Sequence, residues 1–336
     1  MKKVLVTGGL GYIGSHTVVS LYEAGYTPVV VDNCSTSDLW VKERIELIID
    51  SKLKVYEEDV LNNARLLEIA RDEQVQGIIH FAAYILVDES VQQPAKYYRN
   101  NMLGLLSVAG VCQSLNLPLV FSSSCSVYGN PERLPVSEEE AVKKAESPYA
   151  NTKKIGEEIL RDMSAAGEIR TLCLRYFNPI GAHPSALIGE FQDGVPHHLV
   201  PYIVETASGK RKELSVFGSD WDTRDGTCIR DYIHVIDIAE AHIAAMELLV
   251  TNSDLRFDVI NLGSGSGQTV LEMVHAFENS TGVKVPVRLA PRRPGDVEAV
   301  YANNEKAKRI LNWQPKRSLE EMLSSAWHFE QKQQEG

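Results

Sequence analysis

Residues 3–16 read KVLVTGGLGYIGSH, a short apolar run that meets a glycine-rich turn and then an amphipathic segment. Gly8, Gly11 and Gly14 recur at three-residue intervals, which is typical of a first strand that turns tightly into a helix beneath a dinucleotide. We expect Gly8 to make the turn, Gly11 to let the backbone approach a pyrophosphate, and Gly14 to let the helix pack on the strand. The N-terminus of that helix offers free N–H groups and partial positive charge to the phosphates.

Asp32 ends the next β-branched run, about twenty residues downstream, where a carboxylate that binds an adenosine ribose is expected. Its charge would repel a 2′-phosphate, and Asn33-Cys34-Ser35 offers no arginine to bind one. The predicted cofactor is therefore NAD, not NADP. A structural turn followed by a solvated aspartate is the alternative, and the combination of strand, spacing and acid disfavours it.

Short apolar runs alternate with amphipathic segments through the first half of the chain. This alternation predicts an α/β fold, a doubly wound parallel sheet (Rossmann fold) with helices on both faces. Its ligands should bind beyond the carboxyl ends of the strands. The expected strands are 3–7, 28–32, 54–57, 77–81, 119–122 and 171–176, and the expected helices are 13–24, 40–50, 64–71, 94–114 and 149–164.

The regular alternation breaks after Tyr176 into a loop over 178–196 that is rich in Pro, Gly and His. Mixed short elements follow at 214–217, 234–249, 259–262 and 270–280. We expect an NAD-binding Rossmann domain over 1–177, joined by a returning segment near 230–262. The remainder, mainly 178–336, is expected to form a smaller, discontinuous, mixed α/β substrate-binding lobe.

The composition is that of a globular protein, with 44% hydrophobic and 24% charged residues among 336. A net charge of -11 without Lys/Arg runs argues against nucleic acid or an anionic membrane as a partner. With neither a signal-peptide core nor a membrane-length apolar run, the expected location is the cytoplasm. Five scattered cysteines predict reduced, packed thiols, and the histidines lack metal-ligand spacing, so no metal site is expected.

Tyr149 and Lys153 are four residues apart at the start of an expected helix, so both side chains share one face. An adjacent ammonium should lower the pKa of the phenol and make Tyr149 a general base. The same spacing could mark a solvated helix face. Ser124, at the end of the buried run LVFSSS (119–124), would hydrogen-bond the reacting oxygen unless the serines form only a polar turn.

These motifs together resemble the UDP-glucose 4-epimerase family of extended short-chain dehydrogenase/reductases over nearly the whole chain. The resemblance implies that NAD takes a hydride from sugar C4 while Tyr149 removes the hydroxyl proton. The 4-keto sugar then rotates and receives the hydride on its other face, which interconverts UDP-galactose and UDP-glucose. The motifs that carry it are Val4–Gly9, Phe121–Gly129, Ser147–Tyr149, Arg175–Pro179, Gly181–Pro184 and Arg230–Val235.

We expect three groups of site residues. The catalytic residues are Ser124, Tyr149 and Lys153. The cofactor contacts are Gly8, Gly11, Tyr12, Ile13, Gly14, Asp32, Asn33, Thr36, Asp59, Val60, Phe81, Ala82, Ala83, Asn100, Ser122, Tyr149, Lys153, Tyr176 and Phe177. The sugar-nucleotide contacts are Ser124, Tyr149, Phe177, Asn178, His198, Leu199, Phe217, Arg230, Arg293, Asp296 and Val300.

Arginines suit the diphosphate because a guanidinium pairs with phosphate through two hydrogen bonds. The simpler interpretations are a salt bridge from Arg230 to Asp231 and a solvated basic loop around Arg292 and Arg293. Where the family commonly has lysine and glycine, this chain has Ile85 and Asp88, which predicts weaker retention of NAD.

Val300 stands where relatives restricted to glucose and galactose tend to carry tyrosine, so tolerance of UDP-GlcNAc and UDP-GalNAc is a further expectation, unless Tyr301 fills the space. Other UDP sugars, such as a glucuronate or a pentose, are alternative substrates, and a non-catalytic NAD-binding regulator is the alternative role. A sugar dehydratase is disfavoured because Ser124 is followed by Cys125-Ser126, without a carboxylic acid. Family resemblance also implies a homodimer, through the helices at 94–114 and 149–164, and packing of their apolar faces within one chain is the alternative.

Overall fold

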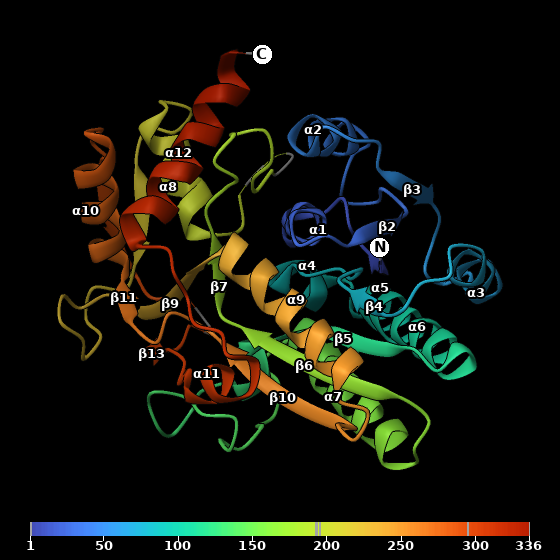
Figure 1. Cartoon of the computed structure of the whole chain (residues 1–336). Helices are drawn as coiled ribbons and strands as arrows, with labels where there is room; N and C mark the ends of the chain where they lie inside the picture. The colour runs from blue at the N-terminus through green and yellow to red at the C-terminus, as the bar shows by residue number, and fades with distance from the viewer. Residues whose placement is uncertain (1, 192–193, 195, 294–295, 336) are drawn as a thin grey trace.

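A central sheet of seven parallel strands organises the chain, in the order β10-β6-β5-β4-β1-β2-β3 (Figure 1). The computed structural model describes residues 2–191, 194, 196–293 and 296–335. The predicted doubly wound sheet is confirmed, and the order reverses between β1 and β4, where a ligand crevice is expected. The strands are β1 (Lys3–Thr7), β2 (Thr27–Asp32), β3 (Lys54–Glu57), β4 (Ile78–His80), β5 (Pro118–Ser124), β6 (Arg170–Tyr176) and β10 (Phe257–Leu262).

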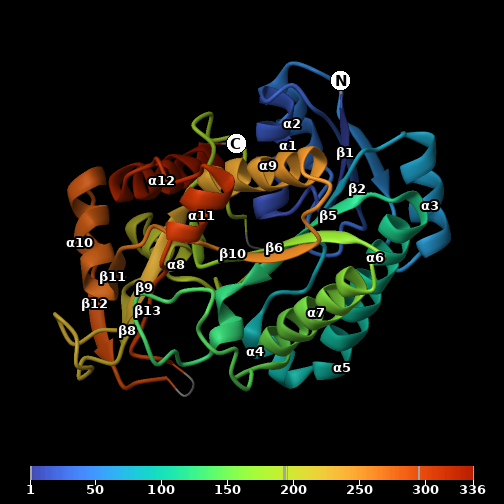
Figure 2. The same ribbon diagram turned by 60° about the horizontal axis from the view of Figure 1, so that its bottom comes forward.

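Helices cover both faces of the sheet because successive side chains of each strand point to opposite sides. Val4 and Val6 pack toward α1 (Tyr12–Glu23), α2 (Trp40–Ile49) and α9 (Val235–Thr251). Leu5, between them, packs toward α3 (Asn63–Asp72) and α6 (Leu103–Leu115), and α7 (Pro148–Ala165) completes that face. Figure 2 shows α9 on one side of β6 and β10, with α6 and α7 on the other.

The helix expected over 94–114 is interrupted. It consists of α5 (Pro94–Tyr97), a π-helical segment (Tyr98–Met102) and α6, and the short helix α4 (Val87–Gln92), which was not predicted, precedes it. One wide turn inside a helix rotates its side chains out of the usual register and often marks a functional site. The apolar pattern over 94–114 predicted one continuous helix and did not indicate this turn.

The later segments form a second group of elements beside the sheet (Figure 2). There β9 (Ile229–His234) pairs with β7 (Asn178–Ile180), β11 (Gly267–Thr269) and β13 (Ala299–Val300), while β8 (Leu214–Phe217) pairs with β12 (Val287–Ala290). Around them lie α8 (Leu199–Ala207), α10 (Val270–Thr281) and α12 (Leu319–Glu335), with α11 (Glu305–Leu311) nearer the main sheet.

Several of these elements differ from the prediction. The loop expected over 178–196, of which 192–193 and 195 lie outside the described residues, begins with β7, and α8 and everything after α10 were missed. Residues 235–262 return to the main sheet, since α9 packs on α1 and β10 pairs with β6, but β9 belongs to the second group. The division into two domains remains a prediction.

Candidate functional site

The glycine-rich turn lies between β1 and α1. Gly8 has φ +70°, and a Cβ there would lie 2.7 Å from the nitrogen of Ala82. A Cβ on Gly14 would lie 2.1 Å from the oxygen of Gly8, so backbone packing alone requires both glycines. A Cβ on Gly11 would meet nothing closer than 3.4 Å, an ordinary contact. The protein leaves space at Gly11, as an approaching pyrophosphate would need.

Asp32 is almost fully buried at the end of β2. Its Oδ2 accepts a hydrogen bond from the N–H of Leu10 at 2.9 Å, and its Oδ1 accepts bonds from the N–H of Cys34 at 3.0 Å and the hydroxyl of Ser37 at 2.8 Å. These bonds fix the carboxylate beside the glycine-rich turn. A carboxylate in this position can accept hydrogen bonds from the ribose hydroxyls of NAD, and its negative charge would repel the 2′-phosphate of NADP.

Other predicted cofactor contacts gather at the neighbouring strand ends. The Asn33 amide donates to Asp59 at 3.0 Å, next to the buried Val60. Across β1, the N–H groups of Phe81 and Ala82 both donate to the oxygen of Thr7, at 3.0 and 3.2 Å, which brings the segment after β4 to the turn. Asp32, Asp59 and Phe81 thus follow three strands that end on one edge of the sheet.

The π-helical segment contributes a residue that the sequence did not single out. The Asn101 side chain bonds both the N–H and the oxygen of Tyr84, at 2.9 and 3.0 Å, and donates to the Thr152 hydroxyl at 3.0 Å. The predicted contact Asn100 donates to Asn101 at 3.0 Å. Asn101 therefore ties the segment after β4 to α7.

Tyr149 and Lys153 lie on the first turns of α7, whose start is fixed by Ser147 accepting from the N–H of Ala150 at 3.2 Å. Lys153 is buried, and its Nζ donates to the main-chain oxygen of Ser122 at 2.6 Å. The pair therefore joins α7 to the carboxyl end of β5, which carries Ser124. The solvated helix face considered as the alternative is wrong for Lys153.

The pKa values of the pair differ from expectation. Burial raises the pKa of Tyr149 to about 12, although a hydrogen bond with Ser124 opposes the rise. Burial also lowers the pKa of Lys153 to about 8. The prediction that Lys153 makes Tyr149 acidic is not met by the protein alone, because the ammonium is directed at the Ser122 carbonyl and both groups are desolvated. A positive ligand beside the phenol would supply the missing charge.

A buried polar network lies behind Tyr149 and Lys153, and sequence reasoning missed it. The Arg175 guanidinium pairs with the Glu157 carboxylate through two bonds, at 2.8 and 2.5 Å, and donates to the Tyr128 hydroxyl at 2.8 Å. Ser123 donates to Glu157, and Tyr128 donates to Asn261 at 2.7 Å. Since Glu157 is one turn beyond Lys153, the network fixes α7 against β5, β6 and β10.

The second group of elements supplies two of the predicted arginines. The Nε of Arg293 donates to Asp296 at 3.2 Å, and Nη2 of Arg230 lies 3.8 Å from the same carboxylate. The guanidinium carbon of Arg293 is 5.0 Å from the ring centroid of Phe217. The structure thus brings four predicted sugar-nucleotide residues together. The alternative salt bridge from Arg230 to Asp231 is wrong.

Asp231 is instead buried and accepts hydrogen bonds from the main chain. Its donors include the N–H of Ser264 at 2.7 Å and that of Ala302 at 2.9 Å.

Burial would lower the pKa of Arg293, but Asp296 and the charge of Asp88 raise it. Asp88, which replaces the glycine common in the family, therefore adds a small contribution to the raised pKa of Arg293.

Arg292, next to Arg293, makes contacts of its own. Its guanidinium carbon lies 3.7 Å from the Trp221 ring centroid, and its Nε donates to Asp220 at 2.7 Å. Trp221 belongs to the loop 218–228 that joins β8 to β9. Arg292 therefore links that loop to the segment that carries Arg293, while Pro291, Arg292 and Arg293 remain exposed, as the solvated-loop alternative expected.

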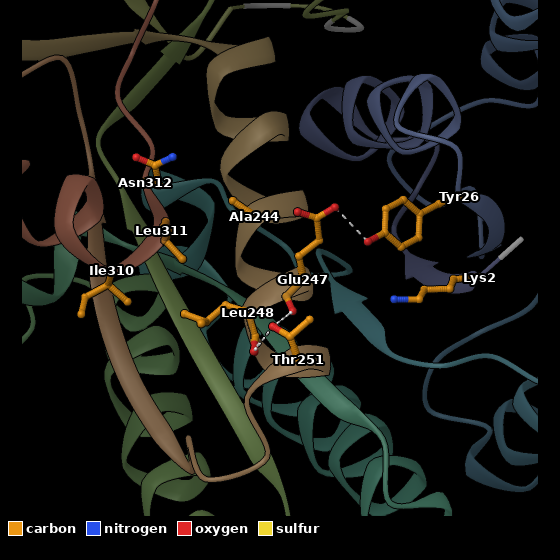
Figure 3. A pocket seen from close by; sticks show the side chains of 9 residues that line it. All are labelled: Lys2, Tyr26, Ala244, Glu247, Leu248, Thr251, Ile310, Leu311 and Asn312. Atoms are coloured by element: carbon orange, nitrogen blue, oxygen red, sulfur yellow. Dashed lines mark hydrogen bonds between the residues drawn. The ribbon is translucent and has the colours of Figure 1, made fainter.

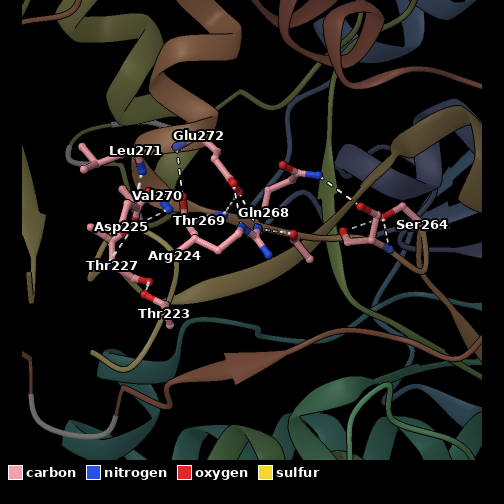
Figure 4. A network of polar contacts seen from close by, with 12 residues as sticks. Thr223, Arg224, Asp225, Thr227, Ser264, Gln268, Thr269, Val270, Leu271 and Glu272 are labelled. Atoms are coloured by element: carbon pink, nitrogen blue, oxygen red, sulfur yellow. Dashed lines mark hydrogen bonds and ion pairs between the residues drawn. The ribbon is translucent and has the colours of Figure 1, made fainter. Parts of the chain in front are cut away.

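The far side of the loop 218–228 is attached to the start of α10 (Figure 4). Arg224 forms two bonds with Glu272, at 2.8 and 2.6 Å. The N–H of Val270 donates to the Thr227 hydroxyl at 3.0 Å, and Thr227 in turn donates to Asp225 at 2.7 Å. The loop between Phe217 and Arg230 is thus held at both sides.

Val300 and Tyr301 point to opposite sides of the chain. Val300 is buried with Val127, Tyr128 and Phe177, against Cys125, next to Ser124. A Cβ on Gly267 would lie 3.0 Å from the Tyr301 ring, so that ring lies against β11. The alternative in which Tyr301 fills the space beside Ser124 is wrong.

The remaining predicted contact residues lie at the starts of other elements or bond to neighbouring segments. Asn178 begins β7, opposite Tyr232 of β9, and Leu199 begins α8. The Nδ1 of His198 lies 2.5 Å from a carboxylate oxygen of Glu190. Tyr12 donates to the oxygen of Gly181 at 2.6 Å, and Tyr176 bonds Ser122.

A cavity of about 380 Å³ lies away from this site, beside the amino end of β1 (Figure 3). Lys2, Tyr26, Glu247 and Leu311 are among its lining residues, and Tyr26 donates to Glu247 at 3.1 Å. None of the predicted site residues lines it. Its position agrees poorly with a ligand site, since ligands of such sheets bind at the carboxyl ends.

Within the described residues, no helix is long and apolar enough to cross a membrane. In that same part of the chain, no three His, Cys, Asp or Glu side chains form a group suited to a metal ion. The five cysteines are unpaired, and three of them are buried: Cys112, Cys173 and Cys228.

Comparison with known proteins identifies relatives along the whole chain. The family model described as GDP-mannose 4,6 dehydratase matches residues 5–326. UDP-glucose 4-epimerase of Pasteurella multocida (strain Pm70) is 45% identical over 335 residues, 99% of this chain and 98% of that protein. The sequence similarity therefore extends over both groups of elements.

Two solved structures have the same fold. UDP-glucose-4-epimerase from Stenotrophomonas maltophila, with bound NAD and formylated UDP-arabinopyranose, has a TM-score of 0.97 and 41% identity, covering 100% of this chain and 99% of that one. UDP-glucose 4-epimerase from Bifidobacterium longum, in complex with NAD+ and UDP, has a TM-score of 0.93 and 40% identity, covering 100% of both chains. With the sequence match over nearly its full length, this chain belongs to the UDP-glucose 4-epimerase family.

Proposed function

We propose that this chain interconverts UDP-galactose and UDP-glucose by inverting carbon 4 of the hexose, with NAD as a bound cofactor. The observation that carries the proposal is the meeting of β5 and α7, where Lys153 donates to the Ser122 oxygen at 2.6 Å and Tyr149 bonds Ser124. The glycine-rich turn and Asp32 lie on the same edge of the sheet. Full-length similarity to UDP-glucose 4-epimerases supports the reaction.

In this mechanism, the glycine-rich turn and Asp32 would hold NAD, which would supply reversible hydride transfer at C4 of the sugar. Tyr149 accepts the C4 hydroxyl proton at its phenolate oxygen and gives it back in the second half of the reaction. Ser124 hydrogen-bonds the reacting oxygen. Burial leaves Tyr149 with a pKa of about 12, so deprotonation at neutral pH requires the positive nicotinamide ring nearby.

Arg230 and Arg293 would bind the diphosphate of the substrate. Both are paired to Asp296 in the protein itself. A diphosphate would replace that carboxylate as their partner, and Asp296 would then be free to accept from a ribose hydroxyl. Phe217, beside Arg293, offers an apolar surface at the same end.

Dehydration of the sugar is not proposed, although the family model is described as a GDP-mannose 4,6 dehydratase. Expelling water needs a carboxylic acid near the catalytic hydroxyl, and the residues after Ser124 are Cys125 and Ser126. The acid nearest in the chain to Tyr149 on α7, Glu157, is held by Arg175 in the buried network.

The substrate range extends, in this proposal, to UDP-GlcNAc and UDP-GalNAc. The support is local: Val300 packs beside Cys125 and Phe177, and the larger Tyr301 turns away toward Gly267. A valine there leaves more room beside the catalytic serine than a tyrosine would.

We further propose a cytoplasmic homodimer. Leu103 and Leu106 are one turn apart on α6 and are 50% and 46% exposed, which suits burial against a second copy through α6 and α7. Five unpaired cysteines suit a reducing compartment. Light scattering of the purified protein tests the dimer, and Leu103→Asp should make it monomeric.

The test of the reaction is conversion of UDP-galactose to UDP-glucose by purified protein, with and without added NAD. Turnover without supplement supports the proposal, including cofactor that survives purification. Turnover only with added NAD supports weakened retention through Ile85.

Tyr149→Phe is the control and should bind NAD normally. No turnover under either condition rejects this substrate, and UDP-glucuronate and a UDP-pentose are then assayed to separate another epimerase from an NAD-binding regulator.

A further inference from the structure

Helix α2 and the segment 187–191 face each other across a cavity of about 250 Å³. The two sides are far apart in the sequence, one directly after β2 and the other after β7. The cavity reaches the start of α1, where the phosphates of a dinucleotide bind. Its lining includes Gly11, Tyr12, Thr36, Trp40, Gly189 and Phe191.

Aromatic contacts join the two sides. The Trp40 and Phe191 ring centroids are 5.2 Å apart, and their planes meet at 84°, an edge-to-face arrangement. The guanidinium carbon of Arg44, one turn along α2, lies 4.3 Å from the Trp40 ring centroid. Arg44 also donates to the oxygen of Leu187 at 3.1 Å and to Gln333 of α12 at 3.0 Å. One arginine thus contacts α2, the segment 187–191 and the C-terminal helix.

These contacts differ from those of a hydrophobic core, because one of the two rings is largely exposed. Phe191 is 53% exposed, although it is a large apolar side chain. Burial therefore explains little of its position, and the contact with Trp40 explains more. An edge-to-face aromatic pair is strong enough to favour contact between the segment 187–191 and α2. It is also weak enough for the two to separate.

We propose that Trp40, Phe191 and Arg44 form a latch that holds the segment 187–191 over the phosphates of NAD and slows cofactor release. The inference rests on the proposed function only in taking NAD as the cofactor. It assigns a role to residues outside the glycine-rich turn and the catalytic pair. It also opposes the weaker retention expected from Ile85, since the latch would offset the loss of a lysine that contacts NAD.

The test measures NAD release directly, without turnover. Holoenzyme is mixed with an excess of an NAD-degrading enzyme, and NAD remaining on the protein is assayed over time after denaturation. Phe191→Ala and Trp40→Ala should each release NAD about 2- to 10-fold faster, the range that corresponds to one aromatic pair. The double variant should release it no faster than the faster single one, because both changes break the same contact.

Leu47→Ala is the matched control, since Leu47 lies on α2, is 70% exposed and does not line the cavity. It should release NAD at the wild-type rate. Trp40→Phe should restore most of the retention, and thermal unfolding of the NAD-free proteins should be unchanged. Equal release rates for wild type, Phe191→Ala and Trp40→Ala would overturn the latch alone. Wild-type protein that neither contains nor binds NAD would overturn both the latch and the proposed cofactor.

Discussion

Lys153 donates its hydrogen bond to the main-chain oxygen of Ser122, 2.6 Å away, so an ammonium group is buried between α7 and the end of β5. Burial lowers the pKa of this lysine to about 8, from an ordinary 10.5. A charged group held in this way contributes to function at a cost in stability. The cost can be separated from the function by substitution.

Lys153→Met should stabilise the NAD-free protein near neutral pH. Between the native and unfolded pKa values, the unfolded chain holds a proton that the native chain has lost, so the wild type gains stability as pH rises through this window. Below it, burying the ammonium costs stability, and methionine removes that cost. We expect a gain of about 2 kcal/mol near pH 7 after subtracting the lost hydrogen bond, and a smaller gain above about pH 9.

Urea unfolding at the two pH values measures this difference, and the same variant should lose nearly all epimerase activity. A variant that is less stable than wild type at neutral pH, or whose advantage grows with pH, would contradict the assignment.

Glu157→Gln should destabilise the fold strongly. It leaves the guanidinium of Arg175, which is 1% exposed, without its charged partner. Breaking a buried ion pair from one side costs about 3–5 kcal/mol. Chemical denaturation measures the change, and Glu158→Gln, at an exposed position on the same helix, is the control.

Arg292→Ala should weaken substrate binding without slowing chemistry. Arg292 touches neither reacting atoms nor the catalytic pair, but it links Asp220 and Trp221 to the segment of Arg293. We expect KM for UDP-galactose to rise about tenfold with kcat within about twofold, as for the loss of uniform binding. Steady-state kinetics decide this. Arg288→Ala, which removes an exposed pair with Glu213, should leave both constants unchanged.

Val300→Tyr should narrow the substrate range. The larger side chain would enter the space beside Cys125 and Phe177, so the ratio of UDP-GalNAc to UDP-galactose activity should fall at least about tenfold. Tyr301→Phe should leave the ratio unchanged because that ring lies against Gly267. If both variants keep the wild-type ratio, Val300 does not determine specificity.

The sequence predicted correctly those features that depend on residues close together in the chain. Gly8 and Gly14 are required by their own turn, and Asp32 follows them at a spacing fixed by one helix and one strand. The alternation of strands and helices likewise predicted the first six strands of the sheet, because each apolar run is complete in itself. Only the final strand, β10, lay far from the others in sequence.

The residues that were missed depend on contacts between distant segments. Asn101 lies in a wide helical turn that the apolar pattern did not indicate. Arg175 reads as one more charge in a strand until Glu157 and Tyr128 are seen around it. The pKa of Tyr149 was misjudged for a related reason. The spacing of Tyr149 and Lys153 does not show where the ammonium points or how deeply the two side chains are buried.

Asp296 gives the resting site a further property. Its carboxylate is shared by Arg230 at 3.8 Å and Arg293 at 3.2 Å, so it serves as an internal counter-ion. An arriving anion must exchange with it. A monovalent anion replaces one negative charge with one and gains little, whereas a diphosphate brings two and satisfies both guanidinium groups. Discrimination against the small anions of the surrounding solution is thereby built into the protein before any nucleotide is recognised.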